Sequence, residues 1–203
     1  MKSLFGVLIF SLSLALGSLG CSSDGGGAGA GISRILGQAF APETDGDETK
    51  EVPLEGATVV LLEYDEEGKL QGATVGTTDA DGNFQVDAQA QAVVVVQVAG
   101  MTNDGETSVE GLFNPDQPMI TKDLDPATSV ACGAGVTAIG DGSITQEELD
   151  ETRVANLEDA ARAYIAATPE FDFYDPDQVS AAVDAVRIAT DDGANPAAAD
   201  AFT

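Results

Sequence analysis

Short apolar runs alternate with turn residues in the first part of the chain, whereas apolar residues recur at helical spacing in the last part. Runs of about four to eight residues that are rich in β-branched or aromatic side chains and bounded by Gly, Asp or Asn are typical of strands. The pattern predicts about seven strands, at residues 35–40, 57–64, 70–77, 84–86, 92–98, 107–113 and 119–124. The acidic segment 42–51 offers no core residue, and we expect a loop there.

The run 92–98, with the sequence AVVVVQV, is apolar at successive positions. Successive side chains of a strand point to opposite faces of a sheet, so this run predicts a central strand that is buried on both faces.

Helix signals begin after residue 122. Asp125-Pro126 and Asp175-Pro176 each place an N-cap residue before a proline at the first helical position. Segment 145–148 (TQEE) has the spacing of a capping box. We therefore expect helices over about 126–139, from 145 to 167, and from 176 to a stop at Gly193 and Pro196. The three aromatics of segment 169–174 are expected to pack against the last two helices.

These patterns predict a mainly β fold. An antiparallel sandwich of about seven strands occupies residues 33–122, and a small α-helical region of about three helices occupies residues 123–203.

Three segments carry a family resemblance: 35–39 (ILGQA), 53–59 (PLEGATV) and 77–86 (TTDADGNFQV). In this order and at this spacing they resemble the carboxypeptidase regulatory-like domain. The resemblance implies a transthyretin-like, Ig-like β-sandwich that serves as a non-catalytic accessory module on secreted and outer-membrane proteins. Independently of the resemblance, Asp79 is expected to accept hydrogen bonds from backbone N–H groups of its own turn, and Gly82 to adopt a positive φ.

The N-terminus reads as an export signal. Lys2 precedes an apolar segment, 4–16, that is too short for a membrane span. Residues 17–21 (GSLGC) resemble the lipobox of bacterial lipoproteins, with Ser18 where leucine is usual. The resemblance implies a signal peptide over residues 1–20, lipidation of Cys21, and outer-membrane sorting. Residues 21–32 are then the lipidated cysteine and a Gly-rich tether. The alternatives are an ordinary secretory signal cut near residue 20, or an uncleaved anchor.

The formal net charge is −27 at pH 7. Such a chain has no basic stripe that could displace counterions from phosphates, which argues against a nucleic-acid partner. The expected partners are the membrane, through the N-terminal lipid, and envelope proteins or glycans. Solubility in salt is the simplest reason for the acidity, and a cation-binding surface is the alternative.

Candidate chemistry is sparse. The chain has no histidine, so the commonest general base and metal ligand is missing. Cys132 lies among small apolar residues, where burial is the default. Asp79, Asp81 and Asn83 offer oxygens at alternate positions, but strand residues follow where calcium would need further ligands. Segment 141–148 matches an EF-hand loop only in part. No cofactor is expected.

The sequence therefore predicts a non-enzymatic, membrane-anchored lipoprotein whose β-sandwich is a binding or structural module at the cell envelope. Such a module binds partners through the loops at its ends or through exposed edge strands. Two alternatives stay open at this point. One is a surface module that binds carbohydrate or calcium, and the other is an enzyme that uses a pair of carboxylates.

Overall fold

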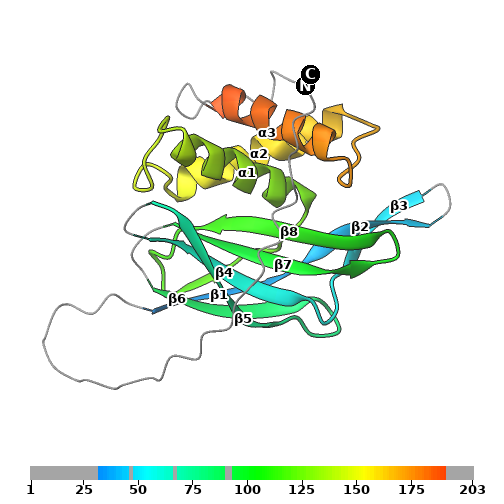
Figure 1. Cartoon of the computed structure of the whole chain (residues 1–203), viewed down its shortest axis with the longest axis horizontal. Helices are drawn as coiled ribbons and strands as arrows, with labels where there is room; N and C mark the ends of the chain where they lie inside the picture. The colour runs from blue at the N-terminus through cyan, green and yellow to red at the C-terminus, as the bar shows by residue number, and fades with distance from the viewer. Residues whose placement is uncertain (1–31, 46–47, 66–67, 90–92, 191–203) are drawn as a thin grey trace, which may run out of the picture.

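The computed structural model describes residues 32–45, 48–65, 68–89 and 93–190, and these form three layers (Figure 1). Three helices lie on one face of a four-stranded sheet, and a three-stranded sheet lies on its other face. The expected mainly β sandwich with a small helical region is confirmed. The expected signal peptide, Cys21 and the tether up to residue 31 fall outside the described residues, as do Gly193 and Pro196.

The four-stranded sheet contains β4 (Thr58–Tyr64), β5 (Leu70–Thr77), β7 (Val94–Thr102) and β8 (Gly105–Phe113). Its order is β5-β4-β7-β8, and every neighbouring pair is antiparallel. Strand β7 is central, as the run of valines predicts.

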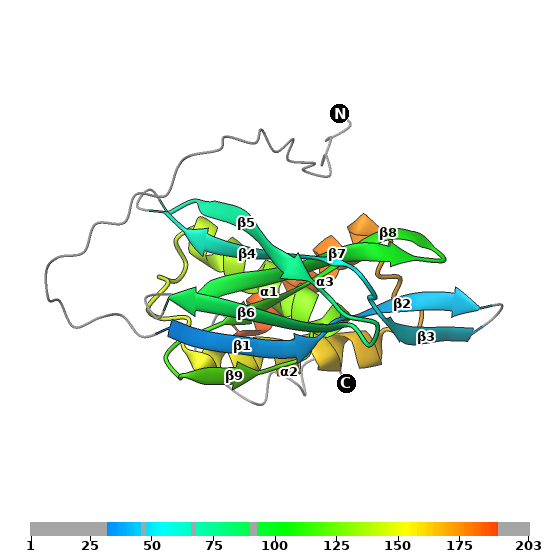
Figure 2. The same ribbon diagram turned by 90° about the horizontal axis from the view of Figure 1, so that it is seen from below.

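The three-stranded sheet contains β1 (Ile32–Gln38), β6 (Asn83–Gln89) and β9 (Met119–Thr121), in the order β6-β1-β9 (Figure 2). Strand β1 is antiparallel to β6 but parallel to β9, so the sandwich is not antiparallel throughout. Gly37 permits the close approach of the chain that follows β9, because a Cβ on this residue would lie 1.9 Å from the carbonyl oxygen of Lys122.

The loop predicted over 42–51 is corrected for residues 42–45 and 48–51, which form strands. They belong to a hairpin of β2 (Phe40–Asp45) and β3 (Glu48–Pro53) that projects from one end of the sandwich (Figure 1). Among the described residues of the two strands only Ala41 is fully buried. Because the hairpin faces solvent on most of its surface, its sequence lacks the alternation of apolar and polar residues by which strands are recognised.

The core has two parts, and β7 contributes to both. Val94, Val96 and Val98 point into the space between the two sheets, and Val93 and Val95 face the helices. This confirms that the strand is buried on both faces. The part between the sheets is formed by apolar side chains of both: Ile35, Val59, Leu61, Phe84, Val86, Val109, Phe113 and Leu124, with smaller residues.

The helices are α1 (Pro126–Gly140), α2 (Glu151–Ala167) and α3 (Pro176–Thr190). Asp125 caps α1 and forms a capping box with Thr128, so the first start signal is confirmed. The start predicted at Thr145 is wrong, because α2 begins at Glu151 with Asp150 as its N-cap. The box residues do bond each other, but they close a separate turn before the helix.

Helix α1 packs against the sheet, and the apolar sides of α2 and α3 pack against α1. Leu112 of β8 joins Val130, Leu157, Val186 and their neighbours in this second part of the core. The helical region is therefore packed onto the sandwich.

Candidate functional site

A cavity of about 650 Å³ lies between the projecting hairpin and the ends of α1 and α2, where the chain continues into the connection between α2 and α3. We call it the hairpin–helix groove. It is within the range of about 300–1,000 Å³ that is usual for ligand pockets. Its lining comes from three places. These are Pro42, Thr44, Thr49, Lys50 and Glu51 of the hairpin; Asp125, Pro126, Ala127, Arg162, Ile165 and Ala166 of the helices; and Pro169 to Tyr174 of the connection.

One face of the hairpin forms a wall of the groove. Pro42 is paired with Glu51, and Thr44 with Thr49, and directly opposed residues of an antiparallel pair project from the same face. All four of these residues line the groove. The groove therefore follows the face of the hairpin and not only its edge.

The hairpin is held in place by hydrogen bonds from β2 to the turn between β7 and β8 and to the connection between α2 and α3. The backbone N–H of Asn103 donates to the Glu43 carboxylate at 3.0 Å, and the N–H of Thr44 donates to Asp104 at 2.6 Å. On the other side, the Tyr174 hydroxyl donates to the carbonyl oxygen of Pro42 at 2.5 Å. The wall of the groove is thus fixed relative to both the sheet and the helices.

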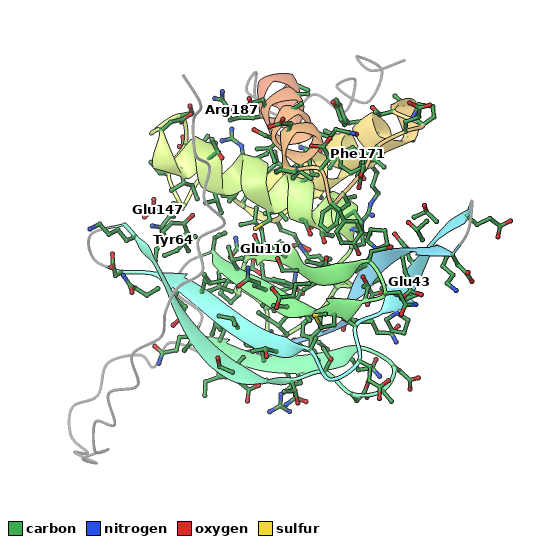
Figure 3. The ribbon with its side chains drawn as sticks, turned by 45° about the vertical axis from the view of Figure 1, so that its right-hand side comes forward. Glu43, Tyr64, Glu110, Glu147, Phe171 and Arg187 are labelled. Carbon is green, nitrogen blue, oxygen red and sulfur yellow. The ribbon has the colours of Figure 1, made fainter. Side chains whose placement is uncertain are left out.

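Aromatic side chains form the opposite wall. Phe171 packs with the helical part of the core and meets Tyr164 edge to face, with ring centroids 6.5 Å apart. Phe173 packs instead against the core between the sheets. The connection therefore contacts both parts of the core, and Phe171 lies at the end of the helical layer (Figure 3). The expectation that these aromatics pack against the helices is confirmed for Phe171, whereas Phe173 packs against the core between the two sheets.

Charged groups line the groove unevenly. Arg162 donates to Asp125 at 2.7 Å, and Asp125 also caps α1. Glu51 lies near this pair, and partial burial, followed by repulsion from Asp125, raises the pKa of the Glu51 carboxyl. Within the described ranges no hydrogen bond reaches the carboxylates of Glu51 or Glu170. The groove therefore presents free acidic groups beside aromatic rings, an arrangement suited to binding a cationic group.

The calcium candidates Asp79, Asp81 and Asn83 lie in the turn before β6. One oxygen of Asp79 accepts from the backbone N–H groups of Asp81 and Asn83, each at 2.9 Å, and the Asn83 amide contacts both carboxylate oxygens. These bonds lower the pKa of Asp79. Gly82 has a φ of 76°, as expected. The side chain of Asp79 thus stabilises the turn, and its oxygens are already bonded within it.

In the segment 141–148, Asp141 accepts from Ser143 and pairs with Arg187 at 3.1 Å, and Glu148 accepts from the N–H of Thr145 at 2.8 Å. Across the described residues, no three His, Cys, Asp or Glu side chains gather closely enough to hold a metal ion.

Cys132 is buried in the interface between α1 and the sheet. Its thiol contacts the Glu110 carboxylate, with Sγ and Oε2 3.8 Å apart, and burial followed by repulsion from Glu110 raises its pKa well above the ordinary value. Figure 3 shows Glu110 between α1 and the sheet. A thiol held in its neutral form is a poor nucleophile, so this cysteine has the character of a core residue.

Sequence reasoning missed the groove. Two of its charged residues, Lys50 and Glu51, come from the hairpin, where the sequence predicts a loop, and Arg162 lies 37 positions after its partner Asp125. The only signal was the concentration of three aromatics at 171–174, which indicated a packed connection but not what it packs beside.

None of the helices in the described ranges is both long enough and apolar enough to cross a membrane.

Comparisons with known proteins leave the family open. No model of a protein family matches the chain, and no curated protein matches it in sequence. Among solved structures, a 9R-lipoxygenase from Cyanothece PCC8801 is similar over 68% of this chain and 25% of its own, at 13% identity and a TM-score of 0.31. The chain thus spans about a quarter of the length of that enzyme, and a likeness of this size does not bear on function.

Proposed function

We propose that this chain is a non-enzymatic, lipid-anchored module of the bacterial cell envelope that binds a partner protein in the hairpin–helix groove. The groove is the observation that carries the proposal. It combines a rigid wall, aromatic side chains and free carboxylates in one cavity, which are the features of a recognition site.

The location rests on the N-terminal sequence. Attachment through Cys21 is supported by the apolar segment 4–16, the lipobox-like residues 17–21 and the Gly-rich segment that follows. Sorting to the outer membrane is supported by Ser22, the residue directly after the cysteine. A diacylated or triacylated cysteine holds a protein durably, since one acyl chain alone binds only reversibly. The tether places the sandwich near the membrane, and the acidic surface opposes its lying on anionic lipid.

Binding is favoured over catalysis by the residues of the groove. Arg162 pairs with Asp125 in the groove, and the chain has no histidine that could serve as a general base. Carbohydrate binding has less support, because the chain has no tryptophan and Tyr64 packs against the helical part of the core. Calcium binding at Asp79 would have to displace the bonds that close its turn.

Two experiments test the two halves of the proposal. Radioactive fatty acid should label the wild-type protein in cells and should not label Cys21→Ser; equal labelling of both would refute the anchor. For the groove, a photoreactive amino acid in place of Glu170 should cross-link an envelope protein. The same amino acid in place of Glu147, which is exposed near the opposite end of the helical layer (Figure 3), should not. Identical cross-links at both positions would refute the groove as the binding surface.

A further inference from the structure

We propose that the occupant of the hairpin–helix groove is an extended segment of a partner protein that carries lysine or arginine side chains. This inference rests on the proposed function, which assigns the groove as the binding surface. It names the chemistry of the partner, and that chemistry follows from the charges, the rings and the shape of the groove.

The groove has an excess of negative charge. Four carboxylates line it, those of Glu51, Asp125, Glu170 and Asp172, against the two cations of Lys50 and Arg162. Arg162 already pairs with Asp125 at 2.7 Å. Lys50 lies 3.6 Å from Asp45, which is outside the groove. The cations present are therefore engaged, and the charge that a ligand meets is negative.

Two of the carboxylates are available to a ligand. Asp125 caps α1, and Asp172 accepts the backbone N–H of Tyr174 at 2.8 Å. Glu51 and Glu170 accept no hydrogen bond from the described part of the chain, and both are exposed. The pKa of the Glu51 carboxyl is raised first by partial desolvation in the groove and then by repulsion from Asp125, while Arg162 acts in the opposite direction.

Aromatic rings stand beside these carboxylates. Phe171, Phe173 and Tyr174 all line the cavity and are only partly buried. A lysine ammonium or an arginine guanidinium gains from the face of an aromatic ring as well as from a carboxylate. A ring also packs against the aliphatic stem of a basic side chain. An anionic or purely neutral ligand would use the rings but would leave Glu51 and Glu170 unpaired.

The shape favours a segment of chain over a small cation. The groove follows the hairpin face, where the pairs Pro42–Glu51 and Thr44–Thr49 lie one behind the other along the strands, and Glu170 lies on the connection across from them. Because side chains of an extended segment alternate in direction, such a segment can direct successive basic residues to separate carboxylates. The formal charge of −27 would also accelerate its encounter with the groove.

The test measures binding of a short fluorescent peptide, with Lys and Arg at alternate positions, to the full-length protein by anisotropy. The medium contains about 0.15 M salt, where the Debye length is about 8 Å and diffuse attraction to the acidic surface is weak. We expect saturable binding of this peptide, no binding of the same peptide with Glu in place of Lys and Arg, and much weaker binding of argininamide.

The double variant Glu51→Gln/Glu170→Gln should weaken binding about tenfold. The matched control is Glu63→Gln/Glu147→Gln, which removes two exposed carboxylates outside the groove and should leave the affinity unchanged. All four positions are exposed, so the folded state is preserved, and far-UV circular dichroism verifies this. Equal weakening in both variants, binding of the acidic peptide, or argininamide binding as tightly as the peptide would overturn the inference.

The outcome can be separated from that of the proposed function. If position 170 cross-links an envelope protein while the basic peptide does not bind, the groove is a binding surface and its proposed occupant is wrong. If the peptide binds in a manner that depends on Glu51 and Glu170 but no cross-link forms in cells, the chemistry of the groove stands and its role in the envelope fails.

Discussion

The side chain of Gln97 donates a hydrogen bond of 2.6 Å to the carboxylate of Glu110, in the interface between the sheet and α1. The two residues are paired across β7 and β8, and the second oxygen of Glu110 contacts the thiol of Cys132. The backbone N–H of Glu110 also donates to the Ser129 hydroxyl of α1 at 2.9 Å, so Glu110 is the centre of several polar contacts in a largely apolar interface. Desolvation outweighs the hydrogen bonds and raises the pKa of Glu110 above its ordinary value of 4.5.

The raised pKa predicts a loss of stability as the pH rises. The folded protein holds the Glu110 proton at pH values at which the unfolded chain, with a pKa near 4.5, has released it. The free energy of unfolding therefore falls between that pH and the raised pKa of the folded state. Glu110→Gln, which keeps an acceptor for Gln97, should have no such loss. Its melting temperature should equal that of the wild type near pH 4 and exceed it at pH 7.

Glu106→Gln provides the control for this prediction. Glu106 lies on the same strand but is exposed, so its replacement changes the net charge equally without changing a buried carboxyl. Thermal melts of the three proteins from pH 4 to pH 8 give the comparison. A Glu110→Gln advantage that stays constant with pH, or an equal advantage for Glu106→Gln, would contradict the assignment.

The parts of the fold that the sequence predicted are those in which local pattern and tertiary packing agree. The valines of β7 read as buried on both faces because each face does meet a separate part of the core. Asp125 and Pro126 start α1 through contacts within four residues of one another. Because such contacts join residues that are close in sequence, the sequence pattern alone is enough to predict them.

The parts that could not be predicted depend on distant contacts. The hairpin β2–β3 is stabilised by Asn103, Asp104 and Tyr174, which are far away in the sequence, and its own residues carry no apolar alternation. The same holds for the groove, because Glu51 and Glu170 are brought together only by the docking of the helices on the sheet. Thr145 and Glu148 show the opposite case, because their local hydrogen bond forms but closes a turn before α2 and does not start a longer helix.

Gly37→Ala should destabilise the protein by about 2 kcal/mol or more. The added Cβ would overlap the backbone carbonyl of Lys122 at 1.9 Å, and a backbone atom cannot move aside as a flexible side chain can. Gly76→Ala in β5 is the control, because a Cβ there meets nothing within 4 Å. Urea denaturation of both variants measures the difference. Comparable free energies of unfolding for the two would show that β1 and the chain after β9 are not packed this closely.

Tyr174→Phe should loosen the hairpin. Its hydroxyl lies 2.5 Å from the carbonyl oxygen of Pro42 and 3.0 Å from the hydroxyl of Thr102, and the loss of such bonds costs about 1 kcal/mol each. Amide hydrogen exchange should become faster in β2 and β3 and stay unchanged in β1 and β6. The groove wall would then be less well ordered, and peptide affinity should fall with it.

Tyr64→Phe is expected to act in the opposite direction. The Tyr64 hydroxyl is buried and has no hydrogen-bond partner among the described residues, and burial raises its pKa to about 12. Removal of an unsatisfied buried hydroxyl should leave stability unchanged or increase it by about 1 kcal/mol. Denaturant melts measure this, and a destabilised Tyr64→Phe would show that the hydroxyl has a bonding partner in solution.

The burial of Cys132 predicts how many thiols of the protein react, and the same count tests the proposed lipid on Cys21. The buried thiol, with its raised pKa, should not react with a disulfide reagent in the native protein and should react fully once the chain is unfolded in guanidinium.

The chain has two cysteines. Acylation through a thioether blocks Cys21, so unfolded protein from the membrane fraction should show one reactive thiol. Cys21→Ser should also show one, and Cys132→Ser should show none. Two reactive thiols in the unfolded wild type, or one in unfolded Cys132→Ser, would mean that Cys21 carries no lipid. Rapid reaction of Cys132 in the native protein would mean that the interface of α1 with the sheet opens readily.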